Sequence, residues 1–106
     1  MKDPVTSPGE DNRLPPPHDA WLLLKEEKLE IVRLDIPPGK SLEPHSNPWR
    51  ILFFVHEGRG MVSFKGQKHE LDTGQLVLIE KDIVRQWSNP SDQTLKLLVV
   101  KLAPDS

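Results

Sequence analysis

From Ala20 onward, proline and glycine divide the chain into short apolar runs, and this punctuation limits the fold more than any other feature of the sequence. The runs read AWLLLKE, KLEIVRLDI, RILFFVHE, GMVSFK, QLVLIE, IVRQW and LKLLVVKL. Turn-forming groups such as Pro37-Pro38-Gly39, Asp72-Thr73-Gly74 and Asn89-Pro90-Ser91 stand between them. Short strands bounded by such groups every ~8 to 12 residues are typical of β-sandwiches and β-barrels. The sequence therefore predicts an all-β fold of seven or more short strands.

Residues 21–34, WLLLKEEKLEIVRL, are the one stretch that could also form an amphipathic helix. From 31 to 102 no window keeps a helical apolar stripe without a proline or glycine inside it. We favour a hairpin for 21–34, with its turn at Glu26-Glu27-Lys28.

The length of 106 residues fits one domain with one core. Residues 1–18 hold five of the eleven prolines and few apolar side chains. Such a segment buries too little apolar surface to offset the entropy of ordering it. We expect a disordered or extended arm over 1–18 and a single barrel domain over 19–106.

Charge and composition exclude several classes of partner. Fourteen basic and sixteen acidic residues give a net charge of −2, which does not attract nucleic acid or anionic lipid. No apolar run approaches the ~18 residues of a membrane span, and the N-terminus lacks the apolar stretch of a signal peptide. The chain contains no cysteine, so disulfides and thiolate chemistry are absent. We expect a cytoplasmic protein with no nucleic-acid and no membrane partner.

Three strands are predicted to be apolar on both faces, namely 51–55, 76–79 and 97–100. A barrel strand with only its inner face in the core has polar residues on the outer face. A second sheet, the N-terminal hairpin or a second subunit could cover this outer surface. We expect a homodimer.

Two segments resemble the double motif of the cupin superfamily, which are small antiparallel jelly-roll β-barrels. The first motif reads glycine, five residues, His-x-His, three or four residues, glutamate, six residues, glycine, and Gly39, His45 and Gly58 fall in place. The second reads glycine, five residues, Pro-x-Gly, two residues, histidine, three residues, asparagine, and Gly74 and Asn89 match it. The resemblance covers about Leu29 to Leu102 and implies a cupin jelly-roll barrel with a degenerate metal site.

The family's metal ligands are mostly replaced in this chain. Asn47 stands at the second histidine, Ile51 at the glutamate and Arg85 at the histidine of the second motif. A guanidinium offers no lone pair and repels a divalent cation, so we expect no metal and no cofactor. Glu43, His56 and His69 could restore a metal site; strand alternation points His56 outward.

If the family geometry carries over, His45, Asn47 and Arg85 converge inside one end of the barrel. Alternation along the strands adds Trp87 and Phe53 to this pocket, and Trp49 could line its mouth. Arginine binds carboxylates and phosphates through paired hydrogen bonds, and tryptophan faces suit sugars and aromatic rings. We expect the ligand-binding residues to be His45, Asn47, Arg85, Trp87, Phe53 and Trp49, and the ligand to be a small anionic or sugar-like molecule.

Each of these residues also has a purely structural interpretation. Arg85 could pair with Glu43, Glu80 or Asp82, and His45 could bond a backbone carbonyl. Trp87 and Phe53 could be core residues, Trp49 could cover an edge, and Asn47 before Pro48 could be a turn residue.

Two classes of function remain open at this point. The first is a metal-free binding or sensing domain that resembles the effector domains of sugar-responsive transcription regulators. The second is an enzyme that resembles the metal-independent cupin epimerases, with His45 as the candidate acid or base. A metal-dependent cupin dioxygenase or isomerase is the weakest alternative.

Overall fold

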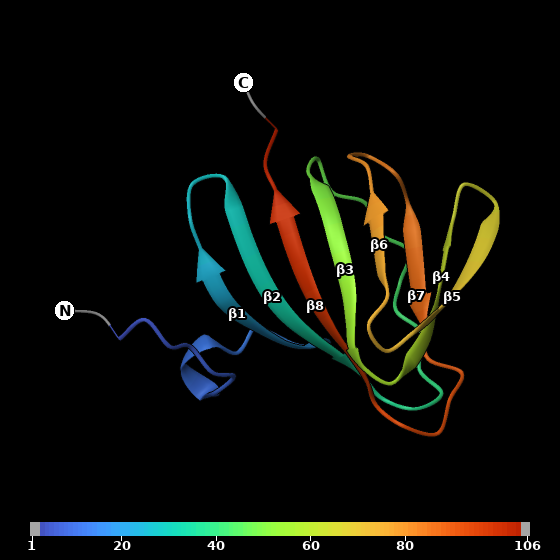
Figure 1. The fold of residues 1–106 in the computed structure, drawn as a ribbon, viewed down its shortest axis with the longest axis horizontal. Coiled ribbons are helices and arrows are strands. Elements are labelled where there is room, and N and C mark those ends of the chain that lie inside the picture. Colours follow the sequence, from blue (N-terminus) through green and yellow to red (C-terminus); the bar gives the residue numbers. More distant parts are fainter. Residues whose placement is uncertain (1–2, 105–106) are drawn as a thin grey trace.

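Two antiparallel sheets face each other in the computed structural model, which describes residues 3–104 (Figure 1). One sheet has five strands in the order β1-β2-β8-β3-β6, and the other has three in the order β5-β4-β7. The strands are β1 (Asp19–Lys25), β2 (Leu29–Ile36), β3 (Arg50–Glu57), β4 (Arg59–Phe64), β5 (Gln67–Asp72), β6 (Leu76–Ile79), β7 (Arg85–Ser88) and β8 (Leu95–Leu102). The all-β jelly-roll prediction is confirmed.

The hairpin expected within 21–34 is confirmed as well. Strands β1 and β2 pair antiparallel, and the Glu26 N–H donates to the Leu29 carbonyl across the turn, 2.7 Å away. The only helix among residues 3–104 is one 3₁₀ turn, η1 (Glu10–Asn12), and no helix in this range could cross a membrane. Strand β5 was not among the predicted runs because most of its side chains are polar.

The core lies between the sheets and follows the period-two alternation of the strands. On β3, Ile51, Phe53 and Val55 are buried, and every second residue from Leu95 to Val99 is buried on β8. Trp87 on β7 and Val62 on β4 close the core from the smaller sheet. Because the inward side chains of β3 and β8 are large and apolar, the two sheets are held together mainly by hydrophobic burial.

One end of the barrel is closely packed around two glycines, and we call it the closed end, built from Gly58, Gly60, Asn89 and Leu95. Gly58 has a φ of +92°, and a Cβ there would lie 2.8 Å from the Thr94 carbonyl oxygen. Gly60 lies within β4 at an ordinary φ, where a Cβ would overlap the Leu95 side chain. Gly58 is therefore a turn residue, as its place between β3 and β4 suggests, whereas Gly60 is needed for close packing.

Asn89 organises the loop between β7 and β8 at this closed end. Its side chain is 1% exposed, and its Nδ2 donates to the carbonyls of Ile36 (2.9 Å) and Gln93 (2.7 Å). Its Oδ1 accepts from the N–H of Ser91 (3.0 Å) and from the Ser91 hydroxyl (2.7 Å). A buried amide is stable only when its donors and acceptor are satisfied, and here all are.

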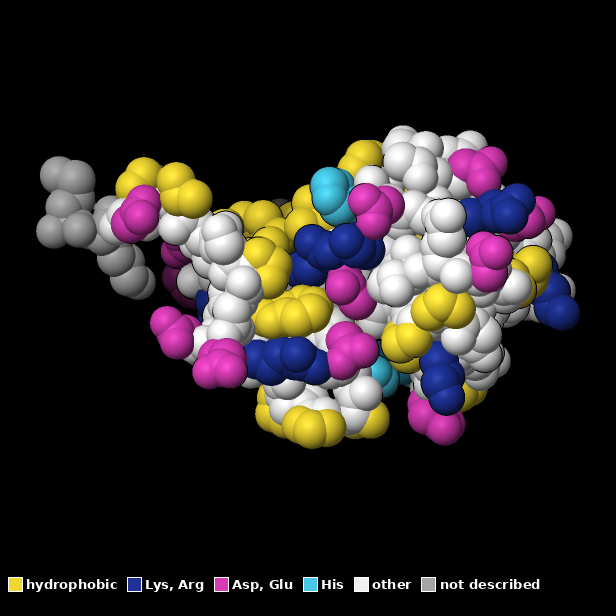
Figure 2. Space-filling view, turned by 90° about the horizontal axis from the view of Figure 1, so that it is seen from below, with side chains coloured by type: hydrophobic (Ala, Val, Ile, Leu, Met, Phe, Trp, Pro, Cys, Tyr) yellow, Lys and Arg dark blue, Asp and Glu magenta, His cyan; other side chains and the backbone are white. Residues whose placement is uncertain are grey.

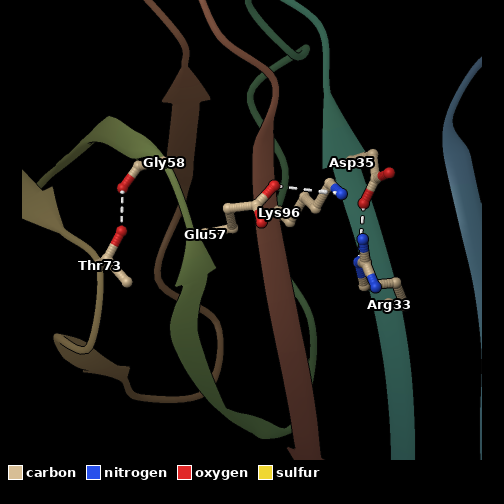
Figure 3. Close-up of polar contacts among 6 residues, drawn as sticks. All are labelled: Arg33, Asp35, Glu57, Gly58, Thr73 and Lys96. Carbon is tan, nitrogen blue, oxygen red and sulfur yellow. Dashed lines mark hydrogen bonds and ion pairs between the residues drawn. The ribbon is translucent and has the colours of Figure 1, made fainter.

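The larger sheet carries an apolar surface on the side away from the core. Strand register brings its members into two rows across four strands, and together we call them the outer apolar face: Ile31, Leu52, Phe54, Leu76, Leu78, Leu98 and Val100. Leu76 remains 55% exposed and Leu78 38% exposed. Ion pairs lie beside this face, Arg33 with Asp35 at 2.8 Å and Lys96 with Glu57 at 3.1 Å (Figure 3).

The described part of the N-terminal arm, residues 3–18, is mostly exposed but touches the barrel near its end. The Leu14 N–H donates to the Ala20 carbonyl at 2.8 Å, and the Leu14 side chain packs on the core. Arg13 pairs with Asp19 at 2.6 Å and lies over the ring of Trp21. Residues 1 and 2 lie outside the described range, and disorder of the arm stays a prediction.

Candidate functional site

A cavity of about 250 Å³ lies between the sheets and extends to the end of the barrel opposite the closed end, where β7 begins and β8 ends. We call this end the open end. Strands β1, β2, β3, β7 and β8 contribute to its wall, together with residues 14–18 and 42–47. The apolar part of the wall consists of Leu14, Ala20, Val32, Leu34, Leu42, Pro44, Phe53, Trp87 and Val99. The polar part consists of His18, Glu43, His45, Asn47, Arg85 and Lys101.

The segment 41–47 is held in place because it runs alongside β7. The backbones of His45 and Arg85 exchange two hydrogen bonds, each 2.9 Å long. The Leu42 N–H donates to the Trp87 carbonyl at 2.9 Å, and the Asn47 carbonyl accepts from the Asp82 N–H at 2.7 Å. The spacing of residues along the two segments therefore places His45 and Asn47 beside Arg85.

Arg85 is partly buried in the cavity wall and has two side-chain contacts. Its Nη1–H donates to Asn47 Oδ1 at 2.7 Å, and its Cζ lies 5.2 Å from the centre of the Phe53 ring. Burial lowers the pKa of Arg85. Among residues 3–104 no carboxylate forms an ion pair with it, and Glu80 pairs instead with Arg50 at 3.0 Å. The alternative that Arg85 is neutralised by Glu43, Glu80 or Asp82 is thus not supported.

Phe53 and Trp87 form the aromatic part of the wall. Their ring centres are 5.3 Å apart at a tilt of 55°, and each residue is 2% exposed. The Trp87 Nε1–H is buried and has no acceptor among the described residues. A buried indole N–H normally has a hydrogen-bond partner, so this wall includes one unsatisfied donor.

His45 is an exposed residue of the cavity wall with positive charges near it. The pKa of His45 is lowered, first by partial burial and then by the positive charges of Arg85, Lys101 and His18. Its imidazole is therefore neutral at pH 7. The described residues offer its side chain no hydrogen-bond partner, which leaves the buried-histidine interpretation without support.

The comparison with known families now identifies the chain. Residues 32–101 match the cupin domain family. The chain belongs to the cupin family. No curated protein matches this cupin.

Solved structures agree with the family at the level of the fold. An RmlC-like cupin family protein from Methanocaldococcus jannaschii superposes with a TM-score of 0.80 at 18% identity, over 97% of this chain and 93% of that one. A Cupin 2 conserved barrel domain protein from Salinispora arenicola gives a TM-score of 0.79 at 19% identity, over 95% and 90%. A protein described as a predicted oxalate decarboxylase from Thermotoga maritima gives 0.76 at 19% identity, over 82% and 81%.

The residues of this cupin do not fit a metal at the family's site. Ile51, at the glutamate position, is buried in the core, and Arg85 occupies the second-motif histidine position. The described residues contain no group of three histidine, aspartate or glutamate side chains arranged to hold a cation. Of the residues that could have restored a site, only Glu43 lines the cavity; His56 is exposed, and His69 stacks on Phe64 at 4.9 Å.

Five of the six predicted ligand-binding residues line one cavity: His45, Asn47, Arg85, Trp87 and Phe53. Trp49 is partly buried and is not part of the wall.

Sequence reasoning missed Lys101, His18 and Leu14. Lys101 could have been found, because it continues the inward alternation of β8 after Val99. Leu14 and His18 lie in the proline-rich segment, where no periodic pattern indicates their position.

Proposed function

We propose that this cupin binds a small acidic molecule at the open end, with Arg85 as the anchor and without a metal. The observation that carries the proposal is the partly buried guanidinium of Arg85 with no carboxylate partner among the described residues. Removing a charge from water is costly unless a counter-charge compensates for it. A ligand carboxylate would supply that counter-charge through a paired, charge-assisted hydrogen bond.

The rest of the wall supports an acid more than a sugar. The aromatic residues Phe53 and Trp87 are each only 2% exposed, so neither offers an open ring face on which a sugar could stack. His18, His45 and Lys101 add basic groups, and Glu43 is the single acidic residue of the wall. A small acid with an apolar body matches this combination of basic rim and apolar floor.

An enzyme remains the second candidate because His45 is a neutral imidazole on the cavity wall and could accept a proton. Against it, no described carboxylate hydrogen-bonds the His45 side chain, and the chain contains no tyrosine. Loss of a carbon-bound proton from a bound acid in heavy water, followed by NMR and absent in His45→Gln, would favour the enzyme. If no carbon-bound proton exchanges with the solvent, the result would favour the binding function over the enzyme.

A thermal-shift screen of small acids and divalent metals tests the binding function, because a ligand of the native state raises the unfolding midpoint. We expect acids to raise it and Arg85→Ala to weaken acid binding by about 10-fold or more, since a charge-assisted bond contributes about 1.5–3 kcal/mol. Arg59→Ala, at an exposed arginine outside the cavity, is the matched control. Unchanged affinity in Arg85→Ala would make Arg85 structural.

The homodimer expected from the sequence is part of the proposal, with the outer apolar face as the interface. Strands β1 and β2 extend the larger sheet instead of folding over it, and the smaller sheet covers the opposite side (Figure 1). Of the three covers considered, a second copy is therefore the one that we propose. The charges beside the face, Arg33 with Asp35 and Lys96 with Glu57, are paired within one chain, so an identical face would meet them already neutralised. On the underside of the molecule, acidic and basic side chains are interspersed (Figure 2).

Sedimentation over a range of protein concentrations tests the dimer. We expect a dimer for the unchanged protein and a monomer for Phe54→Glu, which places a charge in the centre of the outer apolar face. Val84→Glu, at a 58% exposed valine outside that face, should leave the dimer intact. A monomeric unchanged protein would exclude this interface.

The proposed function also includes a cytoplasmic location for this cupin.

A further inference from the structure

Lys101 brings a second cation into the cavity from the opposite sheet. On β8, Leu95, Leu97 and Val99 point into the core, and Lys101 is the next residue in that alternation. It lies level with Ile51 of β3 and Glu30 of β2, and it lines the cavity. Lys101 is partly buried at the end of a core strand, whereas lysine is among the residues least often found in protein interiors.

Lys101 has no ion pair among the described residues, although other cations of the larger sheet have one. Glu30 stands opposite it in the register but forms no ion pair with it and does not line the cavity. Arg33, Arg50 and Lys96, by contrast, each pair with a carboxylate. Two cations without counter-charges therefore face one cavity, Arg85 from β7 and Lys101 from β8.

The two cations act on the same space. The charges of Arg85 and Lys101 both lower the pKa of His45, together with that of His18. Glu43 is the only carboxylate in the wall and is itself exposed. A guest with one negative charge would compensate one cation and leave the other without a partner.

The size of the cavity limits the guest. Its volume of about 250 Å³ corresponds to roughly eight water molecules at liquid density. A short-chain molecule with an anionic group at each end fits this volume.

We propose that the cavity binds a short dicarboxylate, with one carboxylate on Arg85 and the other on Lys101. This inference rests on the proposed acid-binding function and narrows the class of ligand. Arg85 can bind its carboxylate through a rigid fork of donors, whereas Lys101 supplies a compact charge on a flexible stem. Arg85 then fixes one end of the diacid, and Lys101 selects for a second charge and tolerates some variation in chain length.

The test uses the full chain and calorimetric titration with the diacids from malonate to adipate, each beside its own monomethyl ester. The ester keeps the length of the molecule and removes one charge. The variants are Arg85→Met and Lys101→Met, which keep most of the apolar stem, and Lys68→Met at an exposed lysine of β5 as a control for net charge. Circular dichroism and the unfolding midpoint establish that each variant is folded.

We expect at least one diacid to bind about 10-fold or more tightly than its ester, since a charge-assisted bond contributes about 1.5–3 kcal/mol. Lys101→Met should remove most of this preference and leave the ester's affinity nearly unchanged. Arg85→Met should weaken both compounds, and Lys68→Met should change neither.

Three outcomes would overturn the inference. Equal affinity for diacid and ester would show that the second charge is not recognised, while acid binding itself would stand. Equal weakening of both compounds by Lys101→Met would show that Lys101 attracts anions only through its positive charge in general and does not bind the second carboxylate. If neither compound binds the unchanged protein at all, the proposed acid-binding function fails as well.

Discussion

The two ends of the barrel differ in how their polar groups are satisfied. At the closed end, Asn89 is buried with all of its hydrogen bonds made, and Gly58 leaves no room for a methyl group. At the open end, Arg85 and Lys101 carry charges that no carboxylate of residues 3–104 pairs with. Arg85 and Asn89 stand only four residues apart along the same stretch of chain. The hydrogen bonds and close contacts that stabilise the fold are therefore concentrated at the closed end. The charged groups that are available to bind a ligand lie at the open end.

The largest effect is expected for Asn89→Ala at the closed end. The change removes four hydrogen bonds and leaves the carbonyls of Ile36 and Gln93 without this donor. At about 0.5–1.5 kcal/mol each, the loss in free energy of unfolding should be roughly 2–6 kcal/mol in urea denaturation. Ser91→Ala, which loses fewer bonds, should cost less. A loss as small as that of an exposed substitution would show that the loop is not organised by Asn89.

Gly58→Ala should have the next largest effect, and Gly39→Ala is its matched control. Both glycines have positive φ, +92° and +74°, but only Gly58 has backbone within reach of an added Cβ. We expect Gly39→Ala to cost about 1 kcal/mol and Gly58→Ala clearly more, because Thr94 must also move. Equal losses of unfolding free energy in the two variants would mean that the backbone near Thr94 can shift to accommodate the added methyl group at little cost.

At the open end, Arg85→Met should leave the free energy of unfolding unchanged or raise it by up to about 1 kcal/mol. The variant removes a partly buried charge that has no carboxylate partner among the described residues. This gain offsets the loss of the hydrogen bond to Asn47 and of the cation–π contact with Phe53. Urea denaturation without ligand is the measurement. A strong destabilisation would instead place Arg85 among the groups that hold the barrel together.

The smallest effect concerns pH and His45. The pKa of His45 is lower in the folded protein than its ordinary value of about 6.5, so the proton binds the unfolded chain more tightly. The stability associated with neutral His45 is complete above that ordinary value and is lost as the pH falls through the lowered pKa. His45→Gln should therefore lose less stability than the unchanged protein on acidification. An identical loss in both would assign the acid sensitivity to other groups.

The fold could be predicted because it depends on local patterns. Alternating apolar residues and turn groups indicate seven of the strands, and the polar turn at 26–28 indicates the hairpin formed by β1 and β2. Strand β5 was not predicted because it has no run of apolar residues, and Leu71 is its only buried residue. The packing role of Gly60 was not predictable, because the sequence shows the glycine but not the Leu95 side chain packed against it.

The candidate site could be predicted only in part. The motif spacing places His45, Asn47 and Arg85 together, and alternation adds Phe53 and Trp87. Whether a guanidinium has a counter-charge depends on side chains far away in sequence, so the free charge of Arg85 was not predictable. Trp49 follows Pro48 in a bend, where strand alternation does not apply.

The N-terminal segment is part of the candidate binding chamber, although it lies outside every strand. Leu14 and His18 supply wall on the side of β1, and a hydrogen bond from Leu14 to Ala20 fixes them there. A protein trimmed to start at residue 19 would retain all eight strands. The cavity of the trimmed form would nevertheless lack the part of its wall that Leu14 and His18 provide. Ligand screens on the trimmed form would therefore underestimate the affinity of the full chain for its ligands.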